Sequence, residues 1–129
     1  MNLLLDTHAL FWALTSPDRL GPGCRSQIED SSVAVWVSPI SAYEMAHKHR
    51  IGKMPEALAV LPRLADHIAT MGALELPLTT NHCLLAGQLD WSHRDPFDRF
   101  LAAQALSEGC HLVSLDPAFA SLGGLMTLW

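Results

Sequence analysis

Cysteine is scarce in this chain of 129 residues, which has only Cys24, Cys83 and Cys110. The three lie far apart, their number is odd, and no CxxC or Cys/His ligand spacing occurs. Neither a disulfide framework nor a zinc site fits this pattern. We expect three reduced thiols in the core of a protein from a reducing compartment.

Basic residues are few as well. Lysine and arginine total 8 against 13 acidic residues, which gives a formal net charge of −5. This balance argues against a protein that holds nucleic acid by bulk positive charge. It still allows a nucleic-acid enzyme whose acids gather in one cleft and are neutralised there by cations.

The chain also lacks an apolar run of the ~20 residues that a membrane span needs. Its apolar start, MNLLLDTHALFWAL, has no basic lead-in and is interrupted by Asp6 and His8, so it does not read as a signal peptide. We expect a soluble, cytoplasmic protein with no membrane partner.

Alternating strand and helix patterns fill the chain. Half of the residues are hydrophobic, enough for a core at a length that suits one domain. The order predicts an α/β fold: one domain over residues 1–129 with a doubly wound, mainly parallel sheet flanked by helices. Strand patterns stand at residues 2–6, 33–39, 73–78, 111–116 and 125–129, and helical patterns at 7–14, 24–31, 41–53, 55–72, 79–91, 96–108 and 117–123.

Local signals mark where helices start, divide and end. The stretch HRDPFDRFLAAQA places Asp95 and Pro96 as the N-cap and first residue of a helix, and Gly109 should end it. Pro62 falls inside another helical pattern and should kink or divide that helix.

Acidic residues recur where a parallel sheet gathers ligands. Asp6 and Asp116 each end a buried strand pattern, and Glu44 begins the helix after the second strand. In a doubly wound sheet these positions lie at the carboxyl edge. Each acid also has a structural alternative: both aspartates can cap the following helix, and Glu44 can complete a capping box with Ser41.

Asp98 differs because it stands within a helix, three, four and seven residues before Leu101, Ala102 and Ala105. It shares their apolar stripe and should point toward the rim of the core, where a carboxylate needs a partner. If the preceding loop returns to the carboxyl edge of the sheet, Asp98 joins the other acids there.

Carboxylates gathered in this way repel one another unless a cation binds. The hard ions Mg²⁺ and Mn²⁺ suit carboxylate oxygen and water better than zinc does. The expected chemistry is attack of a metal-activated water on a phosphodiester bond.

Four stretches in order, LLLDTHALFWAL, SPISAYEMAHKHRIGK, HRDPFDRFLAAQAL and HLVSLDPAFA, resemble the PIN-domain family over essentially the whole chain. Within it they are similar to the VapC-like ribonuclease toxins of type II toxin–antitoxin pairs. The resemblance implies an endoribonuclease, dependent on Mg²⁺ or Mn²⁺, that hydrolyses RNA phosphodiester bonds. It places the catalytic and metal-binding acids on Asp6, Glu44, Asp98 and Asp116, and it implies a cognate antitoxin protein and a homodimer.

Several secondary candidates accompany the four acids. Thr7 can hydrogen-bond a metal-bound water or the phosphate, or it can cap the next helix; Ser114 stands where the family often has a hydroxyl. Asp95 is expected to cap its helix and to have a secondary role in the metal shell. Arg99 and the other basic residues are either phosphate contacts or solvated surface charges. Those other residues are His47, Lys48, His49, Arg50, Lys53, His93 and Arg94.

The tryptophans are expected to be structural. Trp12 and Trp36 are predicted core residues, and Trp91 and Trp129 belong either to the core or to a subunit contact.

Rival functions fit the residues less well. A phosphatase of the haloacid-dehalogenase type with Asp6 as nucleophile needs a second aspartate two residues on, where His8 stands. A receiver domain should end a middle strand in an aspartate, where this chain has VSP. The remaining alternative is a non-catalytic PIN-fold interaction module, and four intact acids weigh against it.

Overall fold

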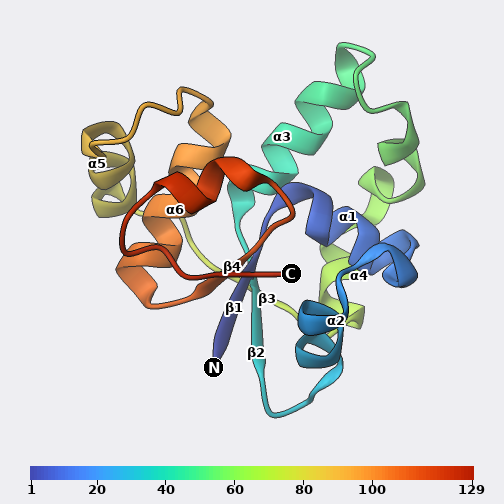
Figure 1. The fold of residues 1–129 in the computed structure, drawn as a ribbon. Coiled ribbons are helices and arrows are strands. Elements are labelled where there is room, and N and C mark those ends of the chain that lie inside the picture. Colours follow the sequence, from blue (N-terminus) through green and yellow to red (C-terminus); the bar gives the residue numbers. More distant parts are fainter.

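A short leucine-rich strand, β1 (Asn2–Leu5), lies at the centre of the fold. The computed structural model, which describes residues 1–129, pairs it in parallel with β2 (Ala34–Val37) and β4 (His111–Val113). The edges are β3 (Leu74–Glu75) and β5 (Thr127–Leu128), so the order is β3-β2-β1-β4-β5 with every pair parallel (Figure 1). The predicted parallel α/β sheet is confirmed.

Helices cover both faces of this sheet because successive side chains of β1 point to opposite sides. Leu3 and Leu5 belong to one core, shared with α1 (Thr7–Thr15), α2 (Pro22–Glu29) and α3 (Pro39–Arg50). Leu4 belongs to the other core, shared with α6 (Pro96–Glu108) and the 3₁₀ helix η4 (Pro117–Ser121). A further helix, α5 (Thr80–Gln88), packs against α6 (Figure 1). The doubly wound arrangement is thus confirmed.

Helix α6 begins and ends where the sequence predicts. Asp95 is its N-cap and accepts a hydrogen bond from the N–H of Phe97 at 2.9 Å, and Pro96 follows as the first helical residue. At the other end Gly109 has a φ of 65°, in the left-handed region that glycine adopts without strain.

The predicted start of α3 is wrong by one turn. Its N-cap is Ser38, whose hydroxyl accepts from the N–H of Ile40 at 3.1 Å, and Pro39 is the first helical residue. Proline suits that first position, so it sets the start ahead of Ser41. Glu44 therefore lies too far into the helix for a capping box.

The helix predicted over residues 55–72 is divided further than Pro62 alone suggested. The segment forms the 3₁₀ helices η2 (Pro55–Ala59) and η3 (Leu61–Arg63) and a short α4 (Leu64–Thr70). Pro62 removes a backbone donor inside the segment and prevents one continuous helix, whereas Pro55 stands at its first position, where proline is tolerated. One more 3₁₀ helix, η1 (Pro17–Arg19), precedes α2. No helix in the structure combines the length and apolarity that a bilayer crossing requires.

The predicted burial of the cysteine and tryptophan side chains is confirmed in part. Cys24 and Cys110 are buried free thiols, but Cys83 of α5 is exposed. Trp91 is buried, whereas Trp12 and Trp36 are only half-buried at the borders of the two cores.

Trp129 is held against the start of α2, where two glycines leave room for it. A Cβ atom on Gly21 would lie 2.4 Å from the backbone carbonyl carbon of Trp129 and equally close to its Cδ1. A Cβ on Gly23 would lie 2.6 Å from the Trp129 carbonyl oxygen. Real Cβ atoms do not come so close, so this packing requires glycine.

We expect Gly21→Ala to lower the free energy of unfolding by about 1–3 kcal/mol, because the new methyl group collides with backbone atoms. Urea denaturation gives this value directly. Gly87→Ala is the matched control: it lies within α5 with nothing within 4 Å, so it should be neutral or stabilising. Equal stability of the two variants would show that Trp129 is loosely placed.

Candidate active site

Two neighbouring strands deliver the first two acids to one edge of the sheet. β1 and β4 pair with their carboxyl ends level, and the N–H of Asp6 donates to the carbonyl of Val113 at 3.0 Å. Asp6 caps α1 by accepting from the N–H of Ala9 at 2.8 Å, and Asp116 caps η4 by accepting from the N–H of Ala118 at 2.9 Å. Helix capping and placement at the carboxyl edge, which the sequence left as alternatives, occur together.

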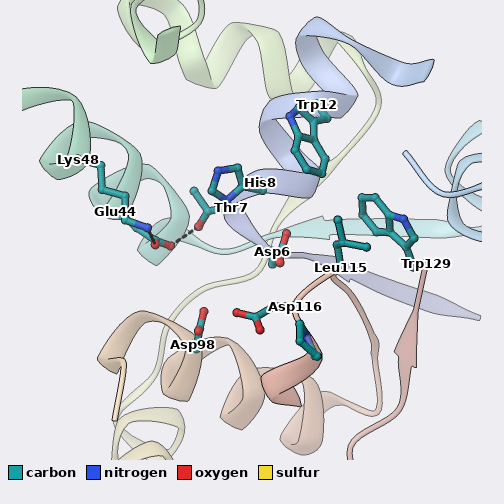
Figure 2. Close-up of a pocket in the computed structure, with 11 residues that line it drawn as sticks. Asp6, Thr7, His8, Trp12, Glu44, Lys48, Asp98, Leu115, Asp116 and Trp129 are labelled. Atoms are coloured by element: carbon teal, nitrogen blue, oxygen red, sulfur yellow. Dashed lines mark hydrogen bonds and ion pairs between the residues drawn. The ribbon is translucent and has the colours of Figure 1, made fainter. Parts of the chain in front are cut away.

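Two helices deliver the other two acids. Glu44 is a buried residue of α3 and Asp98 a half-buried residue of α6. Together with Asp6 and Asp116 they line one cleft of about 430 Å³ (Figure 2). The loop before α6 therefore returns the chain to the carboxyl edge. The other lining residues are Thr7, His8, Trp12, Lys48, Leu115, Pro117 and Trp129.

Asp95 lies beside this cleft and not in its lining. Its carboxylate is used as the N-cap of α6, as predicted. Potential ligand atoms of His93, Asp95 and Asp98 nevertheless come within 4.8 Å of one another. A role for Asp95 in a metal shell stays a prediction.

Two of the cleft acids resist ionisation. The pKa of Asp98 is raised to about 6, mainly by burial and in addition by the neighbouring carboxylates of Asp95 and Glu44, while His93 Nε2, 2.7 Å from Asp98 Oδ2, offsets part of the effect. Burial also raises the pKa of Asp6, although the hydroxyl of Ser114 favours the ionised form. A cation in the cleft would oppose both effects.

Glu44 is held by two protein donors. The hydroxyl of Thr7 donates to Glu44 Oε1 at 2.5 Å, and Lys48 Nζ lies 2.5 Å from Oε2. The Thr7 hydroxyl also lies 3.2 Å from that of Ser41. Of the roles predicted for Thr7, helix capping is wrong, because Asp6 occupies the N-cap position. Its observed partner is a cleft carboxylate.

Lys48 is a positive charge built into the cleft. Burial alone would lower the pKa of its ammonium group, but the hydrogen bond and charge of Glu44 outweigh burial, so the pKa is raised. The negative charges of Asp95 and Asp98 act in the same direction. Lys48 therefore stays protonated and neutralises one of the four acids.

The three aspartates differ from Glu44 in how their oxygens are used. Each employs one carboxylate oxygen in a hydrogen bond to a protein group within 3.5 Å: Asp6 to Ala9, Asp98 to His93 and Asp116 to Ala118. The second oxygens of Asp98 and Asp116 accept no hydrogen bond from the protein, whereas the Asp6 carboxylate also interacts with the Ser114 hydroxyl. Ser114 supports this arrangement, since its Oγ accepts from the N–H of Asp116 at 3.0 Å.

The predicted phosphate contact of Arg99 is not what the structure shows. Its guanidinium donates four hydrogen bonds at 2.8–3.0 Å, one to the carbonyl of Ala86 in α5 and three to the carbonyls of Leu89, Trp91 and His93 in the loop between α5 and α6. These bonds use four of its five N–H donors. Arg99 fixes the loop that places His93 beside Asp98.

Among the other basic residues of the sequence motifs, Lys48 alone lines the cleft. Sequence reasoning missed His8 as a lining residue and assigned Trp12 and Trp129 to structural positions. For His8 the signal was present, because it stands two residues after the first acid. Nothing in the local sequence indicates that Trp129 reaches the same cleft.

The model of the PIN domain family matches residues 3–125. The chain belongs to the PIN-domain family. This PIN domain is 32% identical over 119 residues to Ribonuclease VapC22 of Mycobacterium tuberculosis, a match that covers 89% of this chain and 87% of the relative. The family resemblance read from the four motifs is thereby confirmed.

Solved structures share its fold. VapBC2 from Rickettsia felis, bound to a DNA fragment from their promoter, superposes with a TM-score of 0.72 at 15% identity, covering 98% of this chain and 97% of that chain. VapBC-5 from Mycobacterium tuberculosis, a member of the VapBC family of toxin-antitoxin systems, gives 0.62 at 18% identity, covering 97% and 93%. At these identities the likeness concerns the fold of the PIN domain.

We expect Asp98→Asn to stabilise the metal-free PIN domain at pH 7.5 by about 2 kcal/mol. Because the folded-state pKa of Asp98, about 6, lies above its ordinary value of 3.8, wild-type stability falls as pH rises through 6, and the amide removes this loss. At about pH 3 and below the aspartate is mostly protonated in both the folded and the unfolded state, so the difference should vanish. Urea unfolding with a chelator at both pH values measures it. The exposed Asp18→Asn is the control, and an Asp98→Asn variant that behaves like it would contradict the raised pKa.

We expect Arg99→Met to lower the free energy of unfolding by about 3 kcal/mol, since four carbonyl groups lose a charged donor. The exposed neighbour Arg94→Met should change it by less than about 0.5 kcal/mol. Chemical denaturation of both variants provides the comparison. If Arg99→Met were as stable as the wild type, Arg99 would be free to serve as a phosphate contact.

Proposed function

We propose that this PIN domain is a metal-dependent endoribonuclease that hydrolyses RNA phosphodiester bonds as the toxin of a toxin–antitoxin pair. The observation that carries the proposal is the convergence of Asp6, Glu44, Asp98 and Asp116, from four separate elements, on one cleft. The similarity to a relative named as a ribonuclease supports RNA as the substrate.

The residues of the cleft fit a hard divalent cation. The four acids offer only carboxylate oxygens, and no cysteine lines the cleft. Asp98 and Asp116 each have an oxygen without a protein donor, and burial raises the pKa of Asp6 and Asp98, so a cation would relieve an unfavourable arrangement. Mg²⁺ and Mn²⁺ prefer such ligands. We propose Asp6, Asp98 and Asp116 as the main ligands, with Glu44 completing the set.

When bound there, Mg²⁺ or Mn²⁺ would supply an activated water and stabilise charge on the phosphate oxygens. The protein groups hold the reacting parts in place. Thr7 and Lys48 hold the Glu44 carboxylate in one orientation, and His93 does the same for Asp98. With both oxygens occupied, Glu44 is better suited to orienting a water than to accepting its proton.

We also propose two protein partners, a cognate antitoxin and a second copy of the chain. The VapBC relatives, described as toxin–antitoxin systems, support the first. Large exposed apolar side chains, including Tyr43, Leu58 and Leu74, provide surface that protein interfaces use. In both assemblies the reaction would still take place in the cleft described above.

We expect the purified protein to cut RNA with Mn²⁺ or Mg²⁺ and to lose this activity with a chelator. Asp6→Asn and Asp116→Asn keep an oxygen for each helix cap but remove a charge, so each should reduce the rate by roughly 100-fold or more without unfolding the protein. Gel-based cleavage of a labelled RNA measures the rate, and calorimetry measures cation binding. Asp18→Asn is the matched control.

A protein that binds no divalent cation and cuts no RNA under any metal would contradict the proposal. Tight binding to a partner in that case would favour the non-catalytic interaction module.

A further inference from the structure

One side of the acidic cleft is aromatic. Trp12 of α1 and Trp129, which follows β5, both line it, with ring centroids 5.7 Å apart and planes at 64°. Figure 2 shows the two indoles on one side of Asp6, with Glu44 and Asp98 on the other. We call Trp12 and Trp129 the indole wall.

Contacts from α2 and η1 hold the indole wall in place. Gly21 and Gly23 leave the space that the backbone and ring of Trp129 occupy. The Arg19 guanidinium lies 4.7 Å from the centre of the Trp12 ring, within the range of a cation–π contact. Both indoles are half-buried, so part of each packs on the core and part faces the cleft.

Positive charge cannot supply much of the affinity for RNA. Of eight lysines and arginines, six already contact another group within the protein. Arg25, Lys48 and Arg63 are paired with acids. Arg99 is bonded to carbonyl groups, Arg50 contacts His47, and Arg19 lies over the Trp12 ring. With a net charge of −5, substrate binding needs another source of free energy.

Stacking of a nucleobase on an aromatic ring is such a source, and it tolerates any base. A phosphate held by the acids and their cation would place its attached nucleoside within the same cleft of about 430 Å³. A base inside a duplex already has both faces covered by its neighbours, so only an unpaired base can use the wall.

We propose that Trp12 and Trp129 stack an unpaired nucleobase next to the phosphodiester addressed by the acids. This inference rests on the proposed ribonuclease function and assigns two substrate-binding residues to the same site. Trp12 and Trp129 are then binding residues that act beside the acids.

The test combines a protein change with a loss of one base. Fluorescently labelled heptaadenylate and seven versions of it, each with one abasic position, are titrated against the protein. Ca²⁺ serves as the cation because it also takes carboxylate oxygens, and anisotropy gives the affinities. For the wild type, removal of the stacked base should weaken binding roughly tenfold at one or two positions.

In Trp129→Leu and Trp12→Leu this abasic effect should shrink to less than about twofold, whereas Trp129→Phe should keep much of it. Trp36→Leu removes a half-buried tryptophan outside the cleft and should leave the effect unchanged. Trp129→Leu and Trp129→Phe keep the test valid if Trp12→Leu fails to fold.

Three results would overturn the inference: an abasic effect that survives in both leucine variants, equal weakening of every oligonucleotide, or no binding of heptaadenylate to the wild type. The last result is expected if the indole wall is a docking surface for a partner protein and does not bind bases. RNA cleavage by the wild type with Mn²⁺, measured in parallel, can persist in each case, so the stacking inference can fail while the proposed function holds.

Discussion

The mutual repulsion of carboxylates in one partly buried cleft is the constraint around which this PIN domain is arranged. Four acids arrive from β1, α3, α6 and the end of β4, and two of them have raised pKa values because burial disfavours their charge. The leucine core of β1 sets their positions, since it fixes the level at which the carboxyl ends of β1 and β4 stand. Hydrophobic packing thus supports an electrostatic arrangement that is unfavourable without a counter-charge.

Groups of the protein itself offset only part of this repulsion. Lys48 and Thr7 occupy both oxygens of Glu44, so one acid is neutralised permanently. The three aspartates each use one oxygen in a hydrogen bond that orients the side chain, and the other oxygens of Asp98 and Asp116 accept no hydrogen bond. The cleft therefore combines a fixed internal ion pair with acids that we propose bind an external cation, and Arg99 keeps the loop beside it in position.

Much of this arrangement could be predicted from sequence because it depends on local patterns. Strand runs that end in aspartate, and the Asp95–Pro96 helix start, indicate both the sheet and the place of Asp6, Asp98 and Asp116. The start of α3 was mistaken because Pro39 competed with Ser41, and the capping box assigned to Glu44 failed with it. Long-range contacts could not be predicted: the carbonyl groups bonded by Arg99 and the approach of Trp129 to the cleft depend on how distant segments pack.

The aspartates that cap helices also have a consequence for how such domains can change. Asp6 and Asp116 each accept a hydrogen bond from a backbone N–H at the start of a helix, and both carboxylates also line the cleft. Replacement of either aspartate by asparagine keeps a side-chain oxygen that can cap the helix but removes a negative charge from the cleft. One such substitution therefore separates the stability of this domain from the electrostatics of its cleft.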